Sequence, residues 1–303
     1  ASGWYDAGSQ VTITATANSG YRFYEWVGSG SVSYSGTSST AVITMNSPIT
    51  EDAIFAPGLT VSATGLNSNA QGTVVTVNGV SYTYSQLPVT LYIPPNTTVT
   101  YSFNSPVSGG SGTQFVWQST SGIDTAQSGS FIMPNTATTL IGNYQTQYYL
   151  TMEVSPSGAG SVSPFSGCYP AGAQVTISAT PGTGYEFSNW TGSGSGSYSG
   201  TNNPATIIMY SPITEVAEFK SVPVTITFSA NGISSNYIPS GTILTVSYGG
   251  NTYDITYSQM PYSITVPYGT QVSFSYQNPI SPSSTGVQYV WVSTSGLSSY
   301  QSA

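Results

Sequence analysis

Two copies of one short pattern decide how this chain folds. The segment Gly-Tyr-Glu-Phe-Ser-Asn-Trp at residues 184–190 is matched by Gly-Tyr-Arg-Phe-Tyr-Glu-Trp at residues 20–26. Close to both copies, apolar and polar residues alternate, as in Val-Thr-Ile at 11–13 and again at 175–177. A period of two is the pattern of a half-buried β-strand. No helical period persists beside it, so the sequence predicts an all-β fold.

The similarity extends well beyond the central pattern and defines a repeated unit, which we call module A. Every matched position is displaced by 164 residues, as from Trp26 to Trp190. The other matched pairs of segments are 8–13 with 172–177, 33–36 with 197–200, and 47–51 with 211–215. We expect each copy to form a small antiparallel β unit, with Trp26 and Trp190 as buried core anchors.

A second unit, module B, also occurs twice. Tyr-Ser-Gln-Leu-Pro at 84–88 corresponds to Tyr-Ser-Gln-Met-Pro at 257–261, and Val-Trp recurs ending at Trp117 and Trp291. About seven short strands in fewer than ~100 residues predict an immunoglobulin-like β-sandwich, with these two tryptophans in its core. The predicted domains are A1 (1–56), B1 (57–147), A2 (148–221) and B2 (222–303).

One strand-like stretch is not repeated. Residues 130–164 have no second copy, so A1 is expected to lack its opening strand and B2 its closing strand. Two explanations stay open. The chain is a segment of a longer array, which we favour, or neighbouring chains complete the open modules by donating a strand.

The composition restricts the environment and the function. Only two basic and ten acidic residues occur among 303, and histidine is absent. This excludes a basic nucleic-acid footprint, and no apolar run approaches the ~18 residues of a membrane span. With Cys168 as the only cysteine, zinc, haem and iron–sulfur sites are excluded and no cofactor is expected.

Few titratable groups also mean a fold whose stability depends weakly on pH. We therefore expect an extracellular protein, suited to an acidic habitat. The alternative is a secreted protein at neutral pH that is covered in covalent glycans.

Module A resembles the divergent internalin-type B-repeat family of bacterial and archaeal surface proteins. The resemblance is carried by Gly-Tyr-x-Phe-x-x-Trp at 184–190, by the run 172–175 and by Ser-Pro-Ile-Thr at 211–214, with the same pattern between Tyr5 and Phe55. The alternation with Tyr/Thr/Ser-rich sandwiches is similar to large surface proteins of thermoacidophilic archaea. The resemblance implies an extracellular, structural or adhesive role and supplies no catalytic residues.

Candidate sites are few. Asn96 and Asn189 fit the N-glycosylation pattern. Carboxylates recur at the ends of the A modules, where a scaffold role is favoured and calcium binding is the alternative; they are Glu51, Asp52, Glu215 and Glu218. Asp124-Thr125-Ala126 is similar to half of an acid-protease motif, but its counterpart is Ser298, so a loop Asx-turn is the better interpretation.

The sequence therefore predicts a non-enzymatic structural protein. Its modules would form a cell-surface filament, an adhesive thread or stalk, or a surface layer, by self-association into a polymer or lattice through β-edges and aromatic patches. The alternatives are accessory carbohydrate- or surface-binding modules of a larger secreted enzyme, and a virion surface protein.

Overall fold

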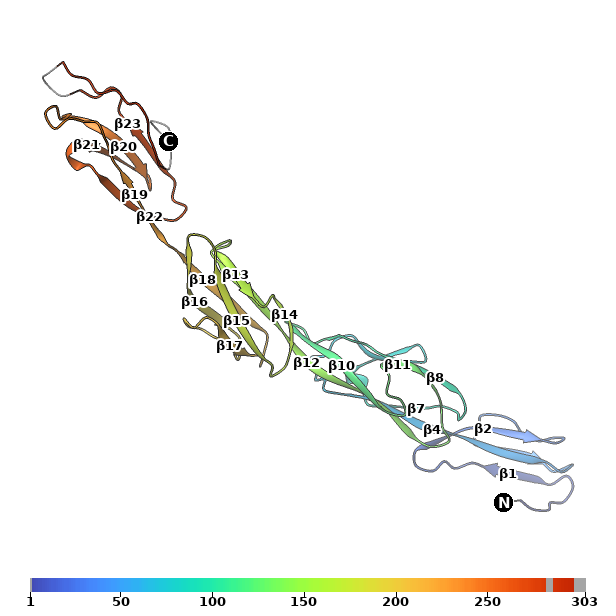
Figure 1. Cartoon of the computed structure of the whole chain (residues 1–303). Coiled ribbons are helices and arrows are strands. Elements are labelled where there is room, and N and C mark those ends of the chain that lie inside the picture. Colours follow the sequence, from blue (N-terminus) through green and yellow to red (C-terminus); the bar gives the residue numbers. More distant parts are fainter. Residues whose placement is uncertain (1, 282–285, 297–303) are drawn as a thin grey trace.

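The computed structural model describes residues 2–281 and 286–296 and shows an elongated row of β modules (Figure 1). Strands make up 55% of the chain and no α-helix occurs among the described residues, so the predicted all-β array is confirmed. Two one-turn 3₁₀ helices, Tyr84–Gln86 and Tyr257–Gln259, occupy matching positions in the two B modules.

The N-terminal module A1 consists of two small layers. Strands β1 (Gln10–Thr14) and β3 (Thr40–Thr44) pair antiparallel in one layer. In the other, β2 (Tyr21–Ser29) pairs antiparallel with the first half of the long strand β4 (Thr50–Thr64).

Module B1 is a two-sheet sandwich. One sheet contains the second half of β4 together with β7 (Val89–Tyr92), β9 (Val107–Ser108), β10 (Thr113–Gly122) and the first half of β12 (Thr138–Ser155). The facing sheet has the order β11 (Ser128–Ile132), β8 (Thr98–Phe103), β5 (Thr73–Val77) and β6 (Val80–Thr83). β4 and β12 pair in parallel, whereas the other pairs of this module are antiparallel.

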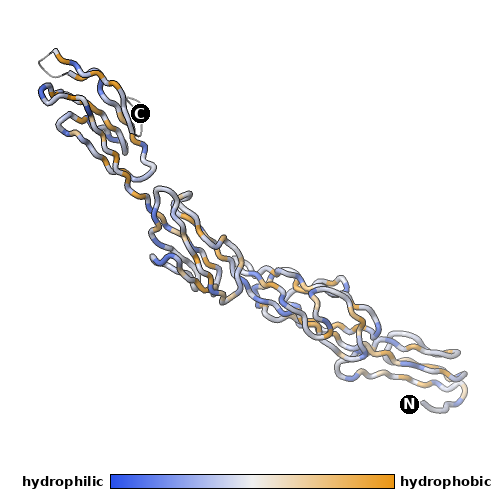
Figure 2. Tube along the Cα trace, in the orientation of Figure 1, coloured by the Kyte–Doolittle hydropathy of each residue, from blue (hydrophilic) through white to orange (hydrophobic). Residues whose placement is uncertain are grey.

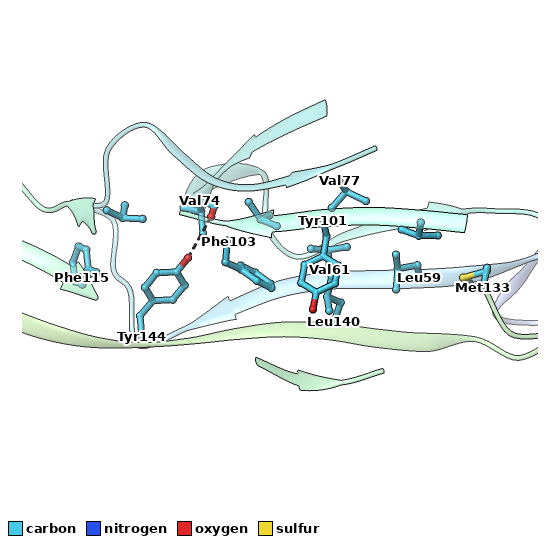
Figure 3. Packing of buried hydrophobic residues seen from close by; sticks show 13 residues of the cluster. Leu59, Val61, Val74, Val77, Tyr101, Phe103, Phe115, Met133, Leu140 and Tyr144 are labelled. Carbon is cyan, nitrogen blue, oxygen red and sulfur yellow. Dashed lines mark hydrogen bonds between the residues drawn. The ribbon is translucent and has the colours of Figure 1, made fainter. Parts of the chain in front are cut away.

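Apolar side chains from both sheets fill the B1 core (Figure 3). Phe103, Phe115 and Leu140 are fully buried. Tyr144 reaches from β12 across the sandwich, and its hydroxyl donates to the carbonyls of Asn104 at 2.9 Å and Val74 at 3.2 Å. This satisfies the hydroxyl inside the core, and burial raises the pKa of Tyr144 above its usual value.

Module A2 repeats the two layers of A1 and adds strands to both. Its first layer contains β16 (Tyr185–Ser193), β18 (Ile213–Ser221), the second half of β12 and β14 (Gly167–Pro170). Its second layer contains β13 (Gly160–Ser163), β15 (Gln174–Pro181) and β17 (Ala205–Ile208).

The described residues of module B2 form fewer strands than those of B1. β19 (Pro223–Phe228) pairs with β22 (Tyr262–Pro267), and β20 (Thr242–Tyr248) pairs with β21 (Asn251–Thr256) and β23 (Val272–Tyr276). Among its last described residues, 286–296, the only ladder contact is an isolated bridge between Ile280 and Tyr289.

Hydrophobic positions are spread over all modules instead of forming one band (Figure 2). Three separate buried clusters lie in B1, A2 and B2. Two of the predicted boundaries, 56/57 and 147/148, fall inside single strands, β4 and β12. The hydrophobic clusters are therefore separate, whereas the strands β4 and β12 continue across the module boundaries.

Candidate assembly interfaces

The joint between B1 and A2 is a hydrogen-bonded strand. β12 pairs with β10 from Leu140 to Tyr148 and with β14 from Gln147 to Leu150. Because Gln147 and Tyr148 pair with both neighbours, β10 and β14 lie on opposite edges of β12. On the β10 edge, β18 takes over from Leu150 onward, in parallel. Each edge of β12 therefore exchanges a B1 neighbour for an A2 neighbour with little interruption.

β4 joins A1 to B1 in the same manner. It pairs with β2 as far as Pro57 and with β7 from Gly58, while β12 joins it from Leu59. At the exchange, the Gly58 N–H donates to the Gly20 carbonyl at 2.9 Å, and the Ile93 N–H donates to the Pro57 carbonyl at 3.2 Å. A1, B1 and A2 consequently share one nine-stranded sheet.

The joint between A2 and B2 has a break at Val222, between β18 and β19. The Val222 N–H donates to the Gly184 carbonyl at 2.8 Å, and the Tyr268 N–H donates to the Val222 carbonyl at 3.2 Å. Tyr268 also packs edge-to-face on Tyr185, with ring centroids 6.1 Å apart. Gly184 lies beneath this ring, at a φ of +79°, and a Cβ there would overlap the Tyr268 ring.

In each A module a carboxyl group holds the loop that follows β2 or β16; this group is buried in A2 and partly buried in A1. In A2, Glu215 is 0% exposed, and its Oε1 accepts the Tyr198 N–H at 2.7 Å. In A1, Glu51 accepts the Tyr34 N–H at the same distance. A glycine lies next to each carboxyl group. A Cβ on Gly192 would lie 2.7 Å from Glu215 Oε1, which is too close for any other residue. These recurrent acids therefore act as scaffold groups within the module.

The second oxygen of Glu215, Oε2, is buried and has no hydrogen-bond partner. Burial raises the pKa of Glu215 above 4.5, and the hydrogen bond from Tyr198 opposes this only in part. A carboxyl with a raised pKa in the folded state is favoured in its protonated form. The folded A2 module therefore favours the protonated, neutral form of Glu215.

The four predicted core anchors are not equally buried. Trp190 is 1% exposed and Trp26 is 8% exposed, whereas Trp117 and Trp291 are only partly buried. Trp117 and Trp291 occupy equivalent positions, in which each indole N–H donates at 3.1 Å to the threonine three residues later.

The two candidate glycosylation sites differ in access. Asn96 is exposed in a turn at a φ of +61°, and its backbone N–H is bonded to the Met133 carbonyl. Asn189 is partly buried beside a β-bulge of β16, and its side chain bonds to Ser188 and Thr191. Asn96 is therefore the better placed acceptor.

The remaining polar candidates have local structural roles. Asp124 forms the expected Asx-turn by accepting the N–H groups of Thr125 at 2.7 Å and Ala126 at 3.3 Å. The first of these bonds does most to hold the pKa of Asp124 below its usual value. Ser298, its sequence counterpart, lies outside the described residues.

The recurrent acids do not gather into a metal site. Within residues 2–281 and 286–296, no three His, Cys, Asp or Glu side chains lie together in a way that would hold a metal ion. Glu51 and Asp52 are consecutive in β4 and so point to opposite faces. Cys168 is exposed on β14.

Apolar side chains remain exposed on the outermost strands. In the four-stranded sheet of B1 the edge strands are β6 and β11, which expose Val80 and Ile132. In A1, β3 exposes Val42. Several tyrosines are also exposed, as expected from their number: Tyr5, Tyr24, Tyr92, Tyr149, Tyr210, Tyr237 and Tyr268. The sequence did not predict which strands lie at the sheet edges, because that depends on the order of the strands in the folded sheet.

The fold and its joints define an array of tandem β modules, of which A1, B1 and A2 are linked by the continuous strands β4 and β12. Residues 1–59 and 150–231 match the family described as divergent InlB B-repeat domain. These segments include most of both A modules, and the second extends through β19 of B2. Domains of this family are typical of cell-surface proteins. No curated protein matches the chain. Among the described residues, no helix has the length and hydrophobicity to cross a membrane.

We predict that Gly184→Ala destabilises the A2–B2 joint more than Gly20→Ala destabilises the A1–B1 joint. Both glycines have φ near +80°, but a Cβ on Gly20 would meet only Ala137, at 3.4 Å. Both variants should lose about 1 kcal/mol from backbone strain, and Gly184→Ala a further ~1–3 kcal/mol from the overlap with Tyr268. Urea unfolding measures both, and equal losses would contradict the role of Tyr268 in the joint.

We also predict that A2 becomes less stable as the pH rises. The pKa of Glu215 is higher in the folded chain than its unfolded value of 4.5. Stability is therefore greatest below pH 4.5 and falls as the pH rises toward and through the folded pKa. Glu215→Gln keeps an acceptor for the Tyr198 N–H and removes the titration, so its stability should not fall over this range.

Native-state hydrogen exchange of the β18 amides, corrected for intrinsic rates, measures this prediction at pH 4 and pH 7. Glu51→Gln in A1 is the matched control and should leave the pH dependence of β18 unchanged. Equal pH dependence in the wild type and Glu215→Gln would show that Glu215 is not responsible.

Proposed function

We propose that this chain is a structural segment of an extracellular surface protein, which forms a filament, thread, stalk or surface layer by self-association. The observation that carries the proposal is strand continuity through the A1–B1 and B1–A2 joints. β4 and β12 cross from one module to the next without leaving the sheet. Such an array transmits tension through backbone hydrogen bonds instead of through flexible linkers.

The direction of the strands supports a load-bearing role. β4 and β12 run roughly along the long axis of the molecule (Figure 1). A pull along that axis would shear many hydrogen bonds of a ladder together, instead of opening them one at a time. The match of both A modules to a surface-protein domain supports the extracellular location.

The composition of the edges supports association. Natural edge strands usually carry charges, proline or bulges that prevent pairing with another sheet. Here β6 and β11 instead present Val80 and Ile132, and neither strand contains a charged residue. The same argument applies to β3, whose five residues are uncharged and include the exposed Val42.

The proposal predicts that the purified chain assembles at high concentration in acid. Sedimentation velocity and electron micrographs at pH 3 should show elongated oligomers, because uncharged edges and exposed tyrosines favour contact between chains. The double variant Val80→Lys with Ile132→Lys should assemble at least tenfold less readily, since both residues are solvent-exposed and lie on edge strands.

The control is Thr76→Lys, on the inner strand β5 of the same sheet, which adds charge without changing an edge. A chain that stays monomeric at high concentration in acid, without detergent or denaturant, would contradict the proposal. Equal loss of assembly in Thr76→Lys would show that net charge, and not the edges, controls association.

A further inference from the structure

In B1, strand β12 fills a slot between two other strands. Its residues 138–143 pair in parallel with β4, and residues 140–148 pair antiparallel with β10. Leu140, Gly142 and Tyr144 face the core and are buried. Gly142 is required there, because a Cβ would lie 2.6 Å from the Phe103 ring.

B2 contains both walls of this slot. β19 corresponds to the second half of β4, since it pairs with β22 as β4 pairs with β7. Residues 289–296 correspond to β10, because the Ile280–Tyr289 bridge repeats the pairing of Val107 with Phe115. Among the described residues, neither wall has a strand on the side that β12 occupies in B1.

A groove of about 1120 Å³ lies between these walls. It is lined by Val224 and Phe228 of β19, by Phe274 and Tyr276 of β23, and by Val290 and Trp291. Val290 is 62% exposed, whereas its counterpart Val116 is partly buried in B1. The lining also includes polar residues such as Thr227 and Gln277. With its apolar side chains and two strand walls, the groove corresponds in position to the space that β12 fills in B1.

A1 contains the complementary half of the slot. In A2, residues 150–155 of β12 pair in parallel with 213–218 of β18. The corresponding residues of A1 are 49–54. Of these, 50–54 pair with β2 on one edge, and none has a backbone partner on the other edge among the described residues. Ile49, Ala53 and Phe55 are correspondingly only partly buried, whereas Ile213, Ala217 and Phe219 are buried.

We propose that B2 and A1 are the two halves of an acceptor site for one extended strand with the pattern of β12. The first half of that strand enters the B2 groove, with Leu-x-Gly-x-Tyr facing inward and glycine against Tyr276. The second half pairs in parallel with residues 49–54 of A1. One strand thus joins B2 of one repeat pair to A1 of the next, as β12 joins B1 to A2.

The incoming strand lies outside these 303 residues. The stretch 130–164 occurs once in this sequence, and its β12 is already held between B1 and A2. This inference rests on the proposed assembly function and specifies the contact that makes it directional. The occupant is a strand, because within the described part of the chain both half-sites offer backbone without a partner beside apolar side chains.

A synthetic peptide of residues 138–155 tests the inference on the full chain. We expect it to bind, to protect backbone amides in both 224–228 and 50–54 from hydrogen exchange, and to link two chains end to end in sedimentation velocity. The half-peptides 138–148 and 148–155 should each protect one segment only and link no chains. A Gly142→Val peptide should bind at least tenfold more weakly, because its side chain meets Tyr276.

Since all the changes are in the peptide, folding of the chain is not affected. Absence of protection at both segments at millimolar peptide, or equal binding of the Gly142→Val peptide, overturns the inference. Chains that assemble in acid but ignore the peptide would retain the proposed function and exclude this contact. Chains that bind the peptide but never associate would support this contact and contradict the proposed assembly function.

Discussion

The exchange of strand partners along β4 and β12 is the constraint on which the rest of the structure depends. Each buried peptide group needs a hydrogen-bond partner, so a strand that leaves one sheet must enter another at once. At Gln147 and Tyr148, β12 meets this condition by pairing on both edges. Since a strand rises ~3.4 Å per residue, its 18 residues extend about 60 Å through two modules. The order of modules along the rod follows from this continuity.

The scarcity of charge changes how the sheets are stabilised. On the exposed faces, neighbouring strands are linked by hydroxyl pairs where other proteins use ion pairs. Thr60 faces Thr90 at 3.2 Å, and Thr225 faces Thr265 at 3.0 Å. Within the described part of the chain, the one salt bridge joins the exposed Lys220 and Glu186 at 3.2 Å. Hydroxyl pairs do not titrate, so acid leaves them intact, and the buried Glu215 is more favourable in acid than at neutral pH.

Sequence periodicity and the internal repeat were sufficient to predict the all-β fold and the alternation of modules. They were also sufficient to identify the unrepeated stretch 130–164 as strands. The continuity of β4 was not predicted, because Pro57-Gly58 reads as a break between elements. In the structure both residues are buried within the strand.

The parallel pairings could not be predicted either, because they depend on which strands become neighbours in space. Burial of Trp117 was overestimated for a similar reason. Its indole N–H donates to the buried Thr120 of the same strand, and no local sequence pattern predicts that contact.

The most direct test of the central claim is native-state hydrogen exchange at the joints of the wild-type chain. The account predicts that the amides of Gly58 in β4 and of Gln147 to Leu150 in β12 exchange as slowly as those of the module cores, such as Val99 and Phe115. Exchange at these joints as fast as in exposed turns would mean flexible linkers between independent modules, and would contradict the account.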